Sequence, residues 1–224
     1  MFIATKVLED FAECFCGRLM DNRINYYLKV DGTKEFKANT VHAGILWSRE
    51  AINNLNILYE KDVKNYSIND LLLLISYSDI LLDATDQIYR VLFNTSKLED
   101  YSSIAYFKNK PRYYNKLDDR LYFKELRAIF SAHPVNINDP KGKGKRFADI
   151  PTKKNPLFCF KNYPPIEGDY DFFERVWTNT KKDEDTIYMP IKVSEIFDFD
   201  KFLSERFDIF LKRLRILAYH RDKI

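Results

Sequence analysis

The chain has 224 residues, of which 46% are hydrophobic and 16% aromatic, so it is long enough to bury a sizeable core. Its six glycines and eight prolines exclude a fibrous or low-complexity protein. Because 36 basic residues face 33 acidic ones, the net charge is only +3, which does not by itself indicate a nucleic-acid partner.

The three cysteines, Cys14, Cys16 and Cys159, form no paired framework. We expect all three to be small buried side chains of a protein in the reducing cytoplasm. The N-terminus lacks the long apolar region and cleavage site of a signal peptide. The longest apolar stretch, residues 71–82, contains two serines and an aspartate, so it is too short and too polar to cross a bilayer. A cytoplasmic protein without a membrane partner is therefore expected.

Apolar residues recur at helical spacing in the N-terminal part of the chain. They predict helices over residues 5–30 and 39–60, the second with Trp47 on its flank. The segment Ser67-Ile-Asn-Asp70 has the spacing of a capping box and predicts a third helix that ends near Phe93. Since this helix is apolar nearly all round at its start, it is expected at the centre of a bundle.

A line of charged residues follows one face of the third helix, namely Asp79, Asp83, Asp86 and Arg90. Three aligned carboxylates have the chemistry to hold a divalent metal ion. The alternative is that the three aspartates are solvated or form ion pairs, with Arg90 at the end of their line. No histidine is placed by the sequence to complete a metal site.

The second half of the chain begins with a loop over residues 94–115. The pair Asp118-Asp119 then opens a helix whose apolar face is formed by Tyr122, Leu126 and Ile129 and which must stop before Pro134. Residues 136–155 are rich in lysine and predict a basic loop.

Short aromatic and β-branched runs in residues 156–192 predict a small antiparallel β segment. Asp198 or Asp200 is expected to cap a last helix within residues 193–224. The predicted fold class is mainly α: residues 1–224 form a single α-rich domain, with a core helical bundle over residues 1–135.

Arg127 and His133 lie near the end of the helix that Asp118 opens. An arginine fork binds phosphate in a bidentate way, and a histidine titrates near neutral pH, so the pair has the chemistry to cleave RNA without a metal. The alternative is structural: Arg127 pairs with Glu125, Asp119 or the aspartate stripe, and His133 hydrogen-bonds to carbonyl groups at the helix end.

The segment Arg127-Ala-Ile-Phe-Ser-Ala-His133 resembles the signature of HEPN-domain proteins, in which four to six residues separate an arginine from a histidine. The pair Arg215 and His220 fits the same signature on the last helix. Arg127 and His133 are preferred because Pro134 sets the helix end and polar residues follow.

The resemblance implies a helical bundle that acts as a metal-independent endoribonuclease without a cofactor, usually as a homodimer, in bacterial stress or phage defence. RNA and an antitoxin or another defence-system protein are the implied partners. The expected RNA-binding residues are Asn136, Lys141, Lys143, Lys145 and Arg146. The alternative function is a non-catalytic helical dimerisation or regulatory module, which Ala128 favours because active members often have a polar residue there.

Overall fold

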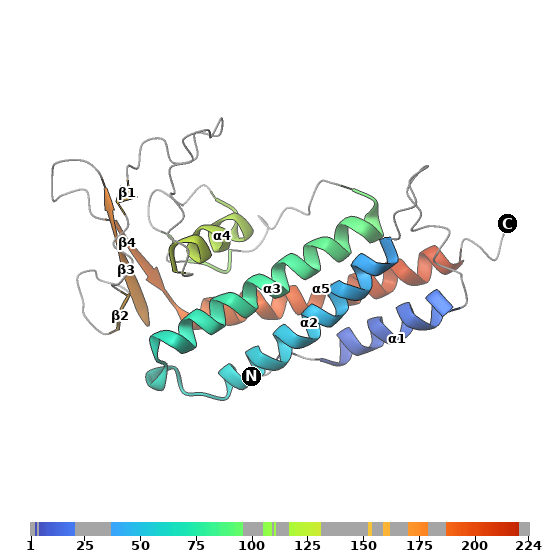
Figure 1. Cartoon of the computed structure of the whole chain (residues 1–224), viewed down its shortest axis with the longest axis horizontal. Helices are drawn as coiled ribbons and strands as arrows, with labels where there is room; N and C mark the ends of the chain where they lie inside the picture. Colours follow the sequence, from blue (N-terminus) through green and yellow to red (C-terminus); the bar gives the residue numbers. More distant parts are fainter. Residues whose placement is uncertain are drawn as a thin grey trace. The chain divides into compact units, whose positions relative to one another are not determined.

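The computed structural model describes residues 3, 5–20, 37–95, 105–108, 110, 117–130, 152–153, 159–161, 170–178 and 187–219 (Figure 1). Its α-helices are α1 (Lys6–Met20), α2 (Lys37–Tyr59), α3 (Ile68–Phe93), α4 (Asp119–Phe130) and α5 (Val193–Tyr219), with a short 3-10 helix, η1 (Val63–Asn65), before α3. The strands are β1 (Thr152–Lys153), β2 (Cys159–Lys161), β3 (Phe172–Thr178) and β4 (Ile187–Ile191). The predicted fold class, mainly helical with an antiparallel β segment before the last helix, is confirmed.

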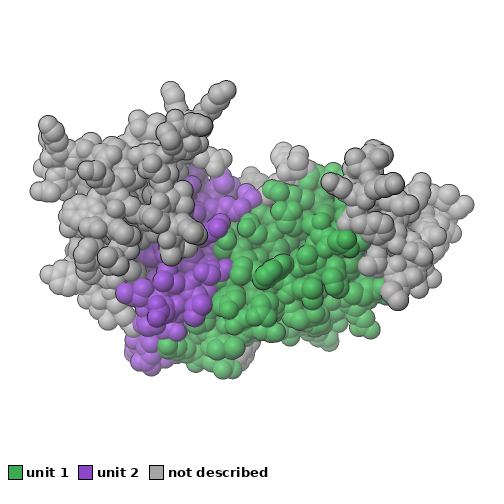
Figure 2. Space-filling view, in the orientation of Figure 1, with its two compact units in different colours: residues 1–61, 77–100, 197–224 green, residues 62–76, 101–196 purple. Residues whose placement is uncertain are grey.

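The chain divides into two compact units, coloured separately in Figure 2. Unit 1 comprises Met1–Lys61, Tyr77–Asp100 and Phe197–Ile224, and unit 2 comprises Asp62–Ser76 and Tyr101–Ile196. Unit 1 therefore holds α1, α2, most of α3 and most of α5, whereas unit 2 holds α4 and the strands.

The core of unit 1 is built from apolar stripes on its helices. Phe11 of α1 lies against two rings of α5, with its centroid 5.6 Å from that of Phe207 and 5.9 Å from that of Phe210. All three rings are fully buried. Burying one such side chain contributes roughly 1.5–3 kcal/mol, so these contacts are a large part of what holds α1 on the bundle.

A buried carboxyl group joins three helices of unit 1. Asp200 of α5 is fully buried, and its Oδ2 accepts hydrogen bonds from the hydroxyl of Ser78 in α3 at 2.8 Å and that of Tyr59 in α2 at 3.1 Å. Burial in this apolar core raises the pKa of Asp200 well above its usual range, although both hydroxyl groups oppose the shift. Asp200 was expected as a helix cap, and it is instead a polar core residue seven positions into α5.

The start of α3 follows the predicted capping box. The backbone N–H of Asp70 donates to Oγ of Ser67 at 3.2 Å, and the backbone N–H of Ser67 donates to the Asp70 carboxylate at 2.6 Å. The helix ends at Phe93 as predicted, because Asn94 adopts a left-handed conformation with φ of 48°.

In unit 2, α4 is an amphipathic helix that covers Phe107. Tyr122 and Phe123 are buried, with ring centroids 5.2 Å and 6.2 Å from that of Phe107. The predicted start of this helix is confirmed, since Oδ1 of Asp118 accepts from the backbone N–H of Leu121 at 2.7 Å. The described part of the helix ends at Phe130.

Strand β3 pairs antiparallel with each of the other three strands. The pairing with β4 sets Phe172 opposite Ile191 and Val176 opposite Ile187. Strand β1 lies within the range expected to be a basic loop, so the β segment begins earlier than predicted.

The last helix begins at Val193, where the range expected for it also begins, but its capping residue differs from the two that were expected. The side chain of Asp171 lies 22 residues before Val193, and its Oδ2 accepts from the Val193 backbone N–H at 2.8 Å. This distant carboxylate satisfies a free amide at the helix start, so neither Asp198 nor Asp200 has to act as the cap.

Of two predictions about the N-terminal segment, one is tested only in part and one is wrong for Cys16. The helix expected over residues 5–30 is described as α1 up to Met20, and residues 21–36 lie outside the described part of the chain. Cys14 is half-buried but Cys16 is exposed, so the prediction of burial is wrong for Cys16. A rotation of about 100° per residue carries Cys16 past the edge of the face that buries Phe15, and the side chain of Cys159 lies outside the described set.

The buried carboxyl group of Asp200 makes stability depend on pH. A pKa that is raised in the folded state contributes stability at low pH, which is lost as the pH rises toward the folded-state value. We expect Asp200→Asn to become more stable relative to the wild type as the pH rises above the ordinary aspartate range, by up to about 1.4 kcal/mol per pH unit. Urea unfolding at several pH values measures the difference.

The matched control is Asp208→Asn, which changes an exposed aspartate of the same helix that pairs with Lys212. This control should show little of the pH dependence. Parallel stability curves for the wild type and Asp200→Asn would contradict the prediction.

Candidate functional site

The arginine of the preferred pair lies on the last described turn of α4. Arg127 is exposed, whereas Tyr122 and Leu126 are buried on the opposite side of the helix, as their spacing predicted. Asp119, one of the carboxylates considered as a partner of Arg127, is only 2% exposed and its Oδ1 lies 2.5 Å from Nζ of Lys110. Arg127 thus lies on the exposed side of α4.

The other members of this predicted site lie outside the described part of the chain. They are His133, Asn136, Lys141, Lys143, Lys145 and Arg146. Their placement relative to Arg127 therefore stays a prediction from the sequence.

The second candidate pair lies at the end of α5. Arg215 is exposed on the helix, which ends at Tyr219, and His220 lies outside the described residues. The neighbouring Arg213 has a structural role, because its Nε donates to the carbonyl of Leu92 at 3.2 Å and its guanidinium lies 5.4 Å from the centroid of the Phe93 ring.

The aspartate stripe on α3 is more buried than a solvated face would be. Asp79 is 9% exposed and Asp86 is 2% exposed, while Asp83 faces the solvent. Within the described ranges, no three histidine, cysteine or acidic side chains gather to hold a metal ion, so the interpretation of the stripe as a metal site is not supported.

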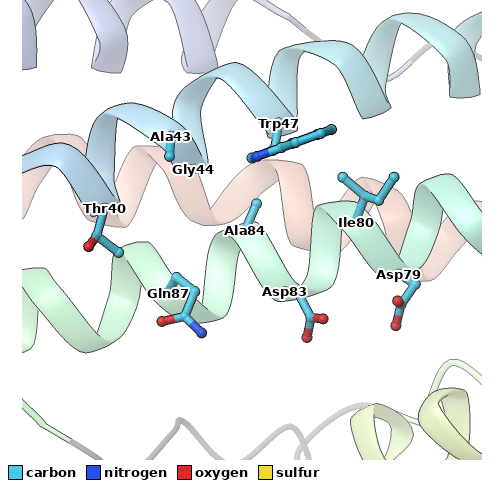
Figure 3. A pocket seen from close by; sticks show the side chains of 9 residues that line it. All are labelled: Thr40, Ala43, Gly44, Trp47, Asp79, Ile80, Asp83, Ala84 and Gln87. Carbon is cyan, nitrogen blue, oxygen red and sulfur yellow. The ribbon is translucent and has the colours of Figure 1, made fainter.

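A groove between α2 and α3 is a site that the sequence did not predict. It has a volume of about 520 Å³ and is mostly apolar. Figure 3 shows the side chains that line it, which come from α2 and α3 and belong to unit 1. The lining residues are Thr40, Ala43, Gly44 and Trp47 of α2, with Asp79, Ile80, Asp83, Ala84 and Gln87 of α3.

The floor of the groove depends on a close approach of the two helices. A Cβ atom added at Gly44 would lie 2.7 Å from Cγ1 and 2.9 Å from Cδ1 of Ile88, and 3.4 Å from the carbonyl oxygen of Ala84. Gly44 and Ile88 are both buried, so neither residue has space to move away from an added Cβ atom. The glycine therefore allows α2 to pack against α3 at this point.

Trp47 forms one wall of the groove. Trp47 is 57% exposed, and its ring lies between the two helices, whereas the carboxylates of Asp79 and Asp83 point away from α2 (Figure 3). The groove thus combines an apolar floor with an aromatic wall. In the sequence, the only signals were the small pair Ala43-Gly44 and the tryptophan on the flank of the helix.

Sequence reasoning also missed a buried cation in unit 1. Arg206 is only 2% exposed, and its guanidinium carbon lies 5.3 Å from the ring centroid of Tyr89 and 5.9 Å from those of Phe202 and Phe210. Cation–π attraction of this kind stabilises a desolvated guanidinium by about 2 kcal/mol. The sequence feature that could have indicated the burial of Arg206 is its position on the apolar stripe of α5, one residue before Phe207.

No protein-family model matches the sequence, and neither a curated protein nor a solved structure matches it. The resemblance to HEPN-domain proteins therefore rests on the sequence pattern around Arg127 and His133. Among the helices that the structure describes, none is long and apolar enough to span a membrane.

The close contact at Gly44 leads to a prediction about stability. We expect Gly44→Ala to destabilise the protein by roughly 1–2 kcal/mol, because overpacking against Ile88 outweighs the better helix propensity of alanine. In an Ile88→Ala background the same change should be neutral or stabilising, because the two atoms nearest to the new Cβ are gone.

Urea unfolding of the four proteins in this double-mutant cycle measures the coupling. Equal effects of Gly44→Ala in both backgrounds would show that the two helices are not in contact through this pair.

Proposed function

We propose that the chain is a HEPN-like, metal-independent endoribonuclease that acts in bacterial stress or phage defence. The observation that carries the proposal is the exposed position of Arg127 on the last described turn of an amphipathic helix. The mainly helical fold also supports it, since the resemblance implies such a fold.

In this proposal each residue of the pair has one role. The guanidinium of Arg127 binds the scissile phosphate through two hydrogen bonds and stabilises the charge that grows on its oxygens. His133 transfers the proton, either from the attacking 2′-hydroxyl or to the leaving 5′-oxygen. The products are a 2′,3′-cyclic phosphate and a 5′-hydroxyl, so neither water nor a metal takes part in the cleavage step.

The remaining parts of the proposal concern binding. The basic segment with Lys141, Lys143, Lys145 and Arg146, together with Asn136, contacts the RNA backbone. Two copies of the chain bring their Arg127 and His133 residues together, and an antitoxin or another defence-system protein controls the activity.

The test is cleavage of RNA by the purified full chain in the presence of EDTA. We expect fragments with cyclic-phosphate ends, and a rate that falls about 100-fold or more in His133→Ala, the usual contribution of a general acid or base. Arg127→Ala should fall by a comparable factor, because one donor to a developing charge contributes about 100-fold or more.

Two control variants make this test specific. Lys212→Ala removes one exposed positive charge from α5 and should leave the rate unchanged. The pair Arg215→Ala and His220→Ala tests the second candidate site. If these two changes abolish cleavage while His133→Ala has no effect, the assignment to Arg127 and His133 is wrong.

A second candidate function is a non-catalytic interaction module. The apolar groove between α2 and α3 favours it, because Trp47 is an exposed large aromatic residue of the type that is enriched in protein interfaces. Under this alternative the wild-type protein leaves RNA intact, and removal of the Trp47 ring weakens binding to the partner.

A further inference from the structure

One face of the small β-sheet in unit 2 is buried. Phe172 of β3 lies opposite Ile191 of β4, and neither residue is more than 1% exposed. Successive residues of a strand alternate between the two faces of a sheet, and residues opposite each other in neighbouring strands share a face. Phe172 and Ile191 therefore mark the buried face.

The same register sets three pairs of residues opposite one another on the other face of the sheet. These pairs are Phe160 with Phe173, Arg175 with Tyr188, and Lys153 with Trp177. They bring all four strands together on this face, because β3 lies between its partners. We call the surface formed by these six residues the aromatic face.

The composition of the aromatic face differs from that of an ordinary solvated sheet surface. When an antiparallel sheet has one buried face, the other face normally carries polar residues. Here four of the six positions hold an aromatic residue, and the other two hold an arginine and a lysine. Pro190, which lies opposite Phe173 on the same face, is partly exposed.

The charges on this face all have one sign. Among the strand positions that the structure describes on the aromatic face, none is acidic. The single acidic residue of β3, Glu174, lies opposite Cys159 and Met189 and so belongs to the other face. The aromatic face is therefore complementary to a negatively charged ligand that also has apolar rings or groups to bury.

Single-stranded RNA has this combination of properties. Its bases stack on aromatic side chains whatever their sequence, and its phosphates bind arginine and lysine. The distance along β3 from Phe173 to Trp177 is about 13 Å at a rise of about 3.3 Å per residue. Sheet surfaces with aromatic residues in neighbouring strands stack two or three bases. In a duplex the flat sides of the bases are stacked on each other, so a duplex cannot use the rings in this way.

We propose that the aromatic face of the β-sheet binds single-stranded RNA, with Phe173 stacking on a base and Arg175 binding a phosphate. The inference rests on the proposed function in that it takes RNA as the ligand. It adds a binding surface to the pair Arg127 and His133, and it gives the β segment a role that the cleavage step does not.

The test measures binding of an oligonucleotide that the proposed reaction cannot cleave. The full chain is titrated into a labelled single strand of about 12 nucleotides, a length within the range that one such surface covers. Every 2′-hydroxyl is methylated, which removes the attacking group. We expect this strand to bind at least about tenfold more tightly than a duplex of the same sequence, because only the single strand offers its bases for stacking.

Substitutions on the aromatic face test its location. Phe173→Leu keeps an apolar side chain but removes the ring, and it should weaken binding by about 5- to 150-fold, the effect of one lost base stack. Phe173→Tyr retains the ring and should bind as the wild type does. Trp47→Leu is the matched control, because it removes an exposed ring from unit 1, and it should leave binding unchanged.

A second variant tests the phosphate contact and does not depend on the folding of Phe173→Leu. Arg175→Gln should weaken binding to all sequences to a similar extent. It should also lower the steepness with which affinity falls with salt, by about the contribution of one phosphate contact. Circular dichroism shows whether each variant keeps the wild-type secondary structure.

The fluorescence of Trp177 gives a direct readout of the surface. The chain has two tryptophans, so Trp47→Phe leaves Trp177 as the only emitter. We expect the oligonucleotide to quench this emission and the quenching to saturate. The converse variant, Trp177→Phe, reports Trp47 alone and should show no change.

Three outcomes would overturn the inference. The first is equal or tighter binding of the duplex, and the second is unchanged affinity in folded Phe173→Leu and Arg175→Gln. The third is Phe173-dependent binding of an acidic peptide without binding of the oligonucleotide, which would make a protein segment the ligand. If the oligonucleotide binds as expected but the wild type leaves RNA uncut, the ribonuclease proposal fails and this inference stands. If RNA is cut but the aromatic face binds nothing, the inference fails alone.

Discussion

The hydrogen bonds of Asp200 constrain how the helices of unit 1 fit together. A buried carboxyl group is costly unless it is hydrogen-bonded, and its two donors come from different helices, Ser78 in α3 and Tyr59 in α2. A shift of one helix by a single residue would separate these groups and leave a polar atom without a partner in the core. Apolar contacts alone tolerate many small shifts, so the polar cluster gives the bundle a defined register.

That register determines which helix faces remain outside. With α2 and α3 held at the Asp200 cluster, Gly44 comes to lie against Ala84 and Ile88, and Trp47 is left on the outer surface. The groove is therefore a consequence of packing elsewhere in the core. Its shape depends on a glycine whose replacement by any larger residue must displace a buried isoleucine.

The sequence predicted features that depend on neighbours in the chain and missed those that depend on distant residues. The capping box of Ser67 and Asp70 and the apolar stripe of α5 are local patterns, and both were predicted correctly. The predicted cap of α5, Asp198 or Asp200, was wrong because the residue that caps the helix, Asp171, lies 22 residues before Val193. Of the predicted site, the structure describes Arg127 on α4 and Arg215 on α5.

The burial of charged groups was also beyond local reasoning. Asp86 lies on a face of α3 for which the pattern predicted contact with solvent, and Arg206 lies on α5, whose pattern predicted an apolar face. Each residue is only 2% exposed. Nothing in the spacing of a single helix says which of its faces a second helix will cover. Phe202 and Phe210 lie one turn before and one turn after Arg206 on α5, but the ring of Tyr89 reaches Arg206 only after α3 and α5 have packed together.

Not every exposed apolar residue of unit 1 indicates an interaction site. Ile57, Ile209 and Ile216 are single side chains that are between 43% and 66% exposed, and scattered residues of this kind are normal on a protein surface. Trp47 is different because it borders a hollow of about 520 Å³ with a floor of small residues. Large rings beside a concave apolar surface are where interface energy concentrates.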